Sequence, residues 1–247
     1  MRVFLAHLRS PSYKDDAENP IPYHGRDPYL EWLTQKLKST PMKRESLIVL
    51  PAGVPGIVDD EEMLSLEPLR KLARTKQINM ILGAYQKSKI PRRVYNTSVL
   101  LNHRGDHAVY HKMTVLEEEG RLHNVVRGTH PQIFHVRQDE REFKVAPFID
   151  HDILNSSRNG ILSLPFEYQQ ADMIVVQNSY EDPAWQATLA NTLNSWHRPV
   201  VFSTRAEGTH SKVLHAAGEF QAPVKEGLHF VDVPLPESFE ETHVLQH

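Results

Sequence analysis

The feature that most constrains the fold of this chain is a series of short apolar runs, each bounded by polar or turn-forming residues. Runs of this length are typical of buried β-strands. Segments with helical spacing separate several of them, and this alternation predicts a mixed α/β layered domain. The predicted strands are Val3–Leu8, Leu47–Leu50, Met80–Gly83, Thr97–Leu101, His107–His111, Lys144–Ile149, Met173–Val176, Val200–Ser203 and Ser211–His215.

Apolar residues recur at helical spacing in the segments between these strands. The turn at Asn102–Asp106 contains a glycine and predicts a hairpin, and a second hairpin is predicted to turn at Ala216–Glu219. The predicted helices are Asp27–Ser39, Glu61–Lys76, Pro183–Trp196 and a short one at Pro165–Gln170. In the second of them, one face would carry Leu66, Leu69, Leu72 and Ala73.

The length and composition fit one large domain. The chain has 247 residues, of which 40% are hydrophobic and 24% are charged, and chains of this size commonly fold as a single unit. We expect one domain over residues 1–233 and a polar tail over residues 234–247. The segment Ser10–Arg26, rich in proline and aspartate, is predicted to be a surface loop.

Composition also excludes several classes of function. The chain contains no cysteine, which rules out disulfides, thiolate zinc sites and a cysteine nucleophile. Lysine and arginine number 28 against 31 aspartates and glutamates, a net charge of −3 with neutral histidine, so we expect no nucleic-acid partner. The 15 histidines show no HxH or HExxH spacing, and we expect neither a metal nor a cofactor. With no secretory leader recognised and no apolar run long enough to span a bilayer, we expect no membrane association and a cytoplasmic location.

The order of the segments resembles the nitrilase, or carbon–nitrogen hydrolase, superfamily. Leu47–Pro51 is similar to the strand that ends in Pro-Glu in that family, and Val94–Val99 is similar to its Tyr-Asn-Thr-Ala strand. Gly105–Lys112 resembles the hairpin arm that carries the catalytic lysine, Val145–Asp152 the strand of the nucleophile, and Ala171–Val176 the segment after it. The likeness extends over nearly the whole chain and implies a four-layer αββα sandwich.

The resemblance also implies positions for the active residues. The family uses a glutamate as general base, a lysine that stabilises the tetrahedral oxyanion and a cysteine nucleophile. Here the base position falls on Ala52, the lysine position on Lys112 and the nucleophile position on Asp150. A second glutamate often follows the lysine, and from the run Glu117–Glu119 we choose Glu119.

These replacements remove the usual chemistry of the family. Alanine cannot accept a proton, and aspartate, with a reference pKa of about 3.9, is a weak nucleophile toward an amide. An acyl-aspartate would be a mixed anhydride, which is costly to form from an amide. We expect Asp150 to pair with Lys112 instead, because a buried lysine needs a partner of opposite charge.

A new reaction is the alternative, with Asp150, His151 and Lys112 as acid–base groups. Side chains alternate along a strand, so Asp150 and Asp152 would share one face and His151 would lie on the other. Two carboxylates with no further ligand are only a weak signal for Mg²⁺ or Ca²⁺. The sequence leaves open whether Ala52 is the native residue or an introduced replacement.

Four further residues are predicted to line a pocket at this site: Tyr95, His151, Gln177 and Asn178. For Tyr95, a packing role near the core is the favoured reading, and pocket lining is the alternative. Asp182 is expected to cap the Pro183 helix rather than to line the pocket.

We therefore expect a protein with the nitrilase fold that is not a conventional amidase and acts as a binding, regulatory or structural subunit. The alternative is a divergent carbon–nitrogen hydrolase, or another small-molecule enzyme, that uses Lys112 and Asp150. The expected partners are a small-molecule ligand and further copies of the chain in a homodimer or larger oligomer. The resemblance implies that subunits pair through Asn155–Tyr168 and Pro183–Trp196.

Overall fold

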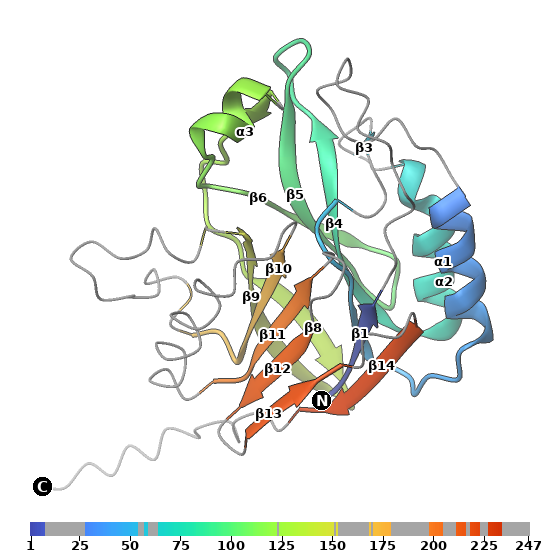
Figure 1. Ribbon diagram of the computed structural model, residues 1–247. Coiled ribbons are helices and arrows are strands. Elements are labelled where there is room, and N and C mark those ends of the chain that lie inside the picture. Colours follow the sequence, from blue (N-terminus) through green and yellow to red (C-terminus); the bar gives the residue numbers. More distant parts are fainter. Residues whose placement is uncertain are drawn as a thin grey trace, which may run out of the picture.

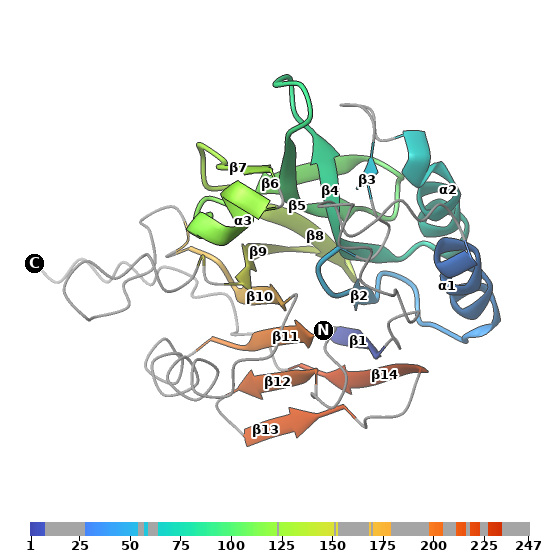
Figure 2. The same cartoon turned by 45° about the horizontal axis from the view of Figure 1, so that its top comes forward.

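Two stacked β-sheets form the centre of the protein in this computed structural model (Figure 1). The structure describes residues 1–7, 28–53, 57–58, 64–122, 124–150, 152, 168, 170–178, 198–204, 211–215, 218–222 and 227–233. Figure 2 shows the same strands after a turn of 45° about the horizontal axis.

The first sheet combines parallel and antiparallel strands. Its order is β14 (Gly227–Asp232), β1 (Arg2–His7), β2 (Leu47–Val49), β4 (Asn79–Lys87), β5 (Val94–Leu101) and β6 (His107–His111), with β3 (Ile57–Val58) beside β4 and β7 (Val125–Val126) beside β5. β1, β2 and β4 are parallel, and β5 is antiparallel to both β4 and β6. The carboxyl ends of β2, β4 and β6 therefore lie at the same edge of the sheet.

The second sheet has a parallel centre. Its order is β13 (Gly218–Gln221), β12 (Lys212–His215), β11 (Val200–Thr204), β10 (Met173–Asn178), β9 (Arg141–Ile149) and β8 (Phe134–Gln138). β9, β10 and β11 are parallel, so polar residues that follow them gather at one edge.

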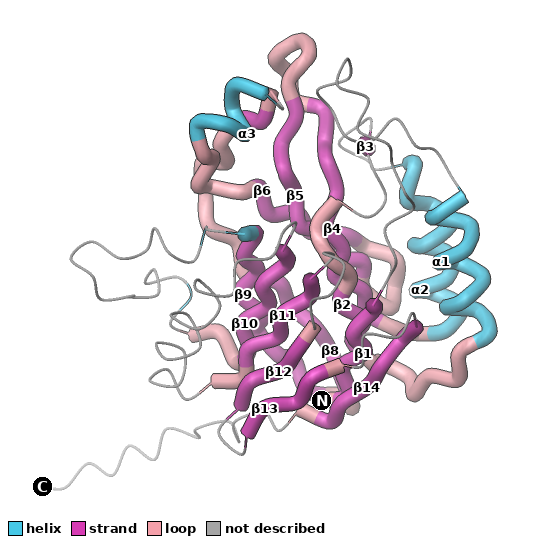
Figure 3. Tube along the Cα trace, in the orientation of Figure 1, coloured by secondary structure: helices cyan, strands magenta, loops and turns pink. Residues whose placement is uncertain are grey.

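The apolar residues form separate layers. The layer between the sheets joins residues such as Val3, Val49 and Ile81 of the first sheet to Val145, Met173 and Val201 of the second. On the outer face of the first sheet lie α1 (Pro28–Ser39) and α2 (Glu67–Lys76), and their buried residues include Leu33, Leu37, Leu69, Leu72 and Ala73. Figure 3 shows these two helices side by side on that face. None of the described helices is long and apolar enough to cross a bilayer.

The predicted α/β sandwich is confirmed by these two sheets and the helices that cover the first. The outer face of the second sheet is also apolar and buried, with Phe148 packed edge-on against Tyr168 at a centroid distance of 4.9 Å. The helix predicted at Pro183–Trp196 and most of that at Pro165–Gln170 lie outside the described residues. So do the loop Ser10–Arg26, the turn residues Ala216 and Ala217, the tail 234–247 and nearly all of the segments expected to pair subunits.

Several elements differ from the sequence-based expectations. Strands β8 and β14 and the short helix α3 (Glu117–Leu122) were not predicted, and α2 begins at Glu67, after the 3-10 turn η1 (Leu64–Leu66), rather than at Glu61. β8 buries alternate residues, Phe134 and Val136, while the residues between them are exposed, which is the pattern of a half-buried strand. The later start of α2 follows from Pro68, since proline suits the first turn of a helix.

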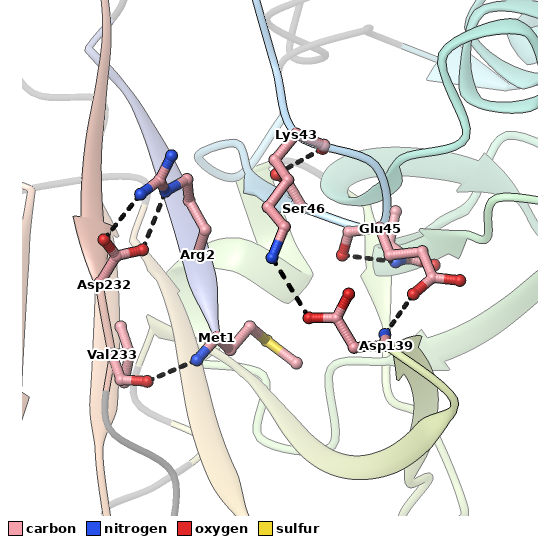
Figure 4. Close-up of polar contacts among 9 residues, drawn as sticks. Met1, Arg2, Lys43, Glu45, Ser46, Asp139, Asp232 and Val233 are labelled. Atoms are coloured by element: carbon pink, nitrogen blue, oxygen red, sulfur yellow. Dashed lines mark hydrogen bonds and ion pairs between the residues drawn. The ribbon is translucent and has the colours of Figure 1, made fainter.

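Polar contacts link the two sheets at the edge where β2 and β9 begin (Figure 4). Lys43 Nζ lies 3.3 Å from Asp139 Oδ2, and the Asp139 backbone N–H donates to the Glu45 carboxylate. Nearby, the Met1 ammonium donates to the Val233 carbonyl at 2.7 Å. Because strands β2 and β9 run away from this edge, the residues that follow them meet at the opposite edge.

Candidate functional site

Lys112 follows β6 and is buried between the two sheets, with a side chain that is 0% exposed. Its Nζ donates to Asp150 Oδ2 at 3.0 Å and to Glu119 Oε1 at 2.5 Å. The Lys112 backbone N–H donates to the Asn96 carbonyl, and its carbonyl accepts from the Gly128 N–H, both at 2.8 Å. The lysine is thus held at its backbone and at its charged end.

Asp150 is the first residue after β9, and its backbone turns sharply there. Its φ of +48° lies in the left-handed region, which non-glycine residues rarely adopt and aspartate tolerates better than most. Continued as a strand, the chain would place this side chain on the face opposite Ile149. The left-handed turn directs the carboxylate to Lys112, so the predicted ion pair is present.

Glu119 reaches the same lysine from α3. Its second carboxylate oxygen accepts the backbone N–H of Leu116 at 2.9 Å, which satisfies one of the free N–H groups at the start of the helix. Glu117 in the same run is exposed, whereas the Glu119 side chain is only 17% exposed. Glu119 is thus the third member of what we call the ion cluster: Lys112, Asp150 and Glu119.

The carboxylates decide the charge state of the lysine. Burial alone would lower the pKa of Lys112, but the attraction of Asp150 and Glu119 outweighs burial, and the pKa lies above its ordinary value. The lysine therefore remains an ammonium ion at neutral pH. The three groups of the ion cluster together carry a formal charge of −1.

Asp152 forms a second polar network beside the ion cluster. Its carboxylate accepts the Tyr110 hydroxyl at 2.6 Å and the backbone N–H groups of Thr114 and Met113 at 2.5 and 3.3 Å. Asp150 and Asp152 thus both reach residues at the end of β6, the first at Lys112 and the second on either side of it. Burial raises the pKa of Asp152 to about 6, although the Tyr110 hydrogen bond acts in the opposite direction.

Gln177 and Asn178, at the end of β10, are both buried. Gln177 pairs in register with Ile149, the residue before Asp150, and its Nε2 donates across the sheets to the Leu50 carbonyl at 2.6 Å. Asn178 is level with Thr204 of β11. The alternation of the strand turns Asn178 to the outer face of its sheet, so only Gln177 faces the first sheet and the ion cluster.

Tyr95 does not join the ion cluster. Its ring stacks on His111, with centroids 4.1 Å apart, and His111 Nε2 lies 2.6 Å from Gln86 Oε1. This group lies on the face of the first sheet that α1 and α2 cover, opposite to the face of Lys112. His151 lies outside the described residues.

Ala52 follows β2 and is buried in the apolar layer between the sheets. Its backbone passes close to Gly83 of β4: a Cβ on Gly83 would lie 2.4 Å from the Ala52 Cα. Glycine at position 83 is therefore required to let the Ala52 backbone come so near the sheet.

We expect Gly83→Ala to lower the free energy of unfolding by about 1–3 kcal/mol, because the added methyl group forces the Ala52 backbone to move. Gly120→Ala is the matched control. Its added Cβ would lie 3.7 Å from its nearest neighbour, and alanine in α3 should stabilise the protein by about 0.5–1 kcal/mol. Urea denaturation measures both changes, and equal effects of the two substitutions would contradict the close approach at Gly83.

The sequence-based reasoning missed three residues on the inner face of the first sheet, Tyr85, Ser98 and Tyr110. Tyr85 is level with Asn96, and Ser98 is level with Tyr110. Burial, and then the nearby Asp150 and Glu119, raise the pKa of Tyr85 above its ordinary range. Counting back two residues from Lys112 along its strand would have found Tyr110, since alternate residues share a face.

The geometry limits the chemistry that this site can perform. Ala52 offers no group that accepts a proton, and the carboxylate of Asp150 is engaged by an ammonium at 3.0 Å. Among the described residues, an amide carbonyl would thus meet a carboxylate that is already ion-paired, with the nearest second carboxylate, Glu119, held by the same lysine. Binding of a small molecule through the polar groups between the sheets requires none of these missing functions.

Comparisons with known proteins identify the family and the fold. The sequence model described as carbon-nitrogen hydrolase matches residues 20–220. The comparison with curated protein sequences returned no significant match.

Solved structures of similar fold come from the nitrilase superfamily. Saccharomyces cerevisiae Nit3, a member of branch 10 of that superfamily, is 18% identical with a TM-score of 0.67, over 94% of this chain and 89% of the other. A double mutant of the Nesterenkonia sp. AN1 amidase, with a glutamate changed to glutamine and a cysteine to alanine, was solved in complex with acrylamide. It is 15% identical with a TM-score of 0.68, over 95% and 90% of the two chains. A CN-hydrolase superfamily protein from Xanthomonas campestris, with an arsenic adduct in its active site, is 14% identical with a TM-score of 0.64, over 94% and 90%.

Proposed function

Given that the chain belongs to the carbon–nitrogen hydrolase family, we propose that it binds a small molecule in the family's pocket without hydrolysing it. Its role would be that of a binding, regulatory or structural subunit. The observation that carries this proposal is the ion cluster, in which Asp150, at the nucleophile position, lies 3.0 Å from the fully buried Lys112.

The rest of the chain supports the same reading. It contains no cysteine at any position, so no thiol elsewhere could substitute for the missing nucleophile. Ala52, at the base position, has no titratable group. With neither group at its position, the described contacts of the Lys112 ammonium are those to the carboxylates of Asp150 and Glu119.

Ligand binding without the nucleophile has a precedent among the structural relatives. The double mutant of the Nesterenkonia amidase, altered at a glutamate and at a cysteine, was solved in complex with acrylamide. A protein of this fold can therefore bind a small polar molecule with those two side chains replaced. We extend this to the present chain, where Ala52 and Asp150 stand at the positions of the base and the nucleophile.

We expect the protein to release no ammonia or amine from a panel of small amides, nitriles and carbamoyl compounds. The measurement is product formation by the wild type and by Lys112→Ala, each followed against a buffer blank. Turnover by the wild type that Lys112→Ala abolishes would overturn the proposal in favour of a divergent hydrolase. The double variant Ala52→Glu/Asp150→Cys is the positive control, and gain of amide turnover there would show that the pocket lacks only these two groups.

We propose further that the chain works as a homodimer or larger oligomer. The support for this is the resemblance described from the sequence, which implies subunit contacts through residues 155–168 and 183–196. Sedimentation equilibrium at micromolar concentration tests this, and a monomer across the whole concentration range would contradict it.

A further inference from the structure

Three buried oxygen atoms between the sheets have no hydrogen-bond partner among the described residues. They are Asn96 Oδ1, Ser98 Oγ and Gln177 Oε1, on side chains that are 2%, 0% and 0% exposed. The orientation of the Gln177 amide is fixed, because its Nε2 donates to the Leu50 carbonyl at 2.6 Å. Its Oε1 is therefore an acceptor that still lacks a donor.

All three residues lie close to the ion cluster. The Asn96 carbonyl accepts the Lys112 backbone N–H at 2.8 Å, and Ser98 pairs in register with Tyr110, two residues before the lysine. Gln177 pairs in register with Ile149, one residue before Asp150. The alternation of β5 and β10 turns all three side chains toward the layer between the sheets, and we call them the acceptor group.

A buried acceptor left without a donor keeps the full cost of its desolvation, so the acceptor group favours a ligand that donates hydrogen bonds. An ammonium group has three N–H donors and no acceptor. The ion cluster, with two carboxylates facing one lysine, adds a local charge of −1 that attracts a cation. We propose that this end of the layer between the sheets binds a small organic cation through a primary ammonium group.

Other ligand classes fit the same groups less well. A carboxylate would bring only acceptors to a site that already has an excess of acceptors and of negative charge. A neutral amide could accept from the Ser98 hydroxyl and donate to the two amide oxygens, but it brings no positive charge to the two carboxylates that face Lys112. Ordered water is the remaining occupant, since water commonly satisfies buried polar groups.

This inference rests on the proposed function, because it names the ligand of the same pocket. The proposed function and the cation-binding inference can be disproved independently of each other. Amide turnover would overturn the proposed function whichever molecule binds. Absence of cation binding without any amide turnover would overturn only the inference made here.

The test compares three molecules of similar size and different charge: n-propylammonium chloride, propionamide and sodium propionate, at equal ionic strength. Binding is followed by calorimetric titration and by the rise in the melting temperature of the full chain. We expect saturable binding of propylammonium and at least about tenfold weaker binding of propionamide and propionate, a difference of about 1.4 kcal/mol. Equal affinity for the three, or no saturable binding of propylammonium, would overturn the proposal.

Two variants locate the binding. Glu119→Gln removes one negative charge from the ion cluster, and Ser98→Ala removes one acceptor without changing any charge. Each should weaken propylammonium binding about tenfold, as expected for a lost hydrogen bond to a charged group. Glu142→Gln, in the exposed His135–Glu142 pair, is the matched control and should leave the affinity unchanged. Unchanged affinity in both Glu119→Gln and Ser98→Ala would show that the cation binds elsewhere and would overturn the proposal.

Discussion

Replacing Lys112 by methionine is expected to lower the free energy of unfolding at pH 7 by about 3–5 kcal/mol. Methionine preserves most of the length and apolar volume of the lysine side chain, so the loss reports the charge rather than a cavity. In the variant, Asp150 and Glu119 would remain in place, 1% and 17% exposed, without the ammonium that faces them. Urea denaturation followed by circular dichroism measures the change.

Lys43→Met is the control for this substitution. Lys43 pairs with Asp139 at 3.3 Å, but the two side chains are 56% and 66% exposed, and such surface pairs contribute about 0–1 kcal/mol. The double variant Lys112→Met/Asp150→Asn should recover part of the stability, because it removes one of the carboxylates left by the first change. If Lys112→Met lowers the free energy of unfolding no more than Lys43→Met does, the ion cluster does not stabilise the fold. Ligand binding would then be the remaining role of the ion cluster.

Much of the fold could be predicted because many strands of the two sheets are short, apolar and bounded by polar residues. Periodicity also identified α2, whose predicted face, Leu66, Leu69, Leu72 and Ala73, is buried in the structure. β14 escaped prediction because its sequence, GLHFVD, contains a polar residue at its centre and exposes Phe230. This edge strand is stabilised mainly by its antiparallel pairing with β1. Such a long-range pairing cannot be read from the local sequence.

The ion cluster could be predicted in part. The charge of Lys112 demanded a partner, and Asp150 was the carboxylate that the ordered motifs placed beside it. The left-handed backbone at Asp150 could not be foreseen, because φ is set by the tertiary contacts of the turn. Tyr95 was a candidate for the pocket, with packing as the favoured role, and the register of β5 assigns the inner face to Asn96 and Ser98 instead. A register shift of one residue exchanges the two faces of a strand, and the sequence alone did not fix it.

Asp152 is expected to make the protein less stable as pH rises from 4 to 7. Its pKa is raised from 3.8 to about 6 in the folded state, chiefly by burial. The folded protein therefore holds this proton more tightly than the unfolded chain, so the stabilisation is complete below pH 3.8 and is lost as pH passes through about 6. A shift of this size corresponds to about 3 kcal/mol over the whole window. The carbonyl of an asparagine could still accept hydrogen bonds from Tyr110 and Thr114, and it does not titrate.

The measurement is the difference in free energy of unfolding between the wild type and Asp152→Asn, taken at steps between pH 4 and pH 7. The wild type should lose about 2–3 kcal/mol relative to the variant across that range. Asp232→Asn supplies a control of opposite sign, because the hydrogen bond from Arg2 lowers the pKa of Asp232 and its stabilisation is lost as pH falls. A difference between wild type and Asp152→Asn that stays constant with pH would mean that Asp152 titrates normally, and that the Tyr110–Asp152 network beside Lys112 is open to water.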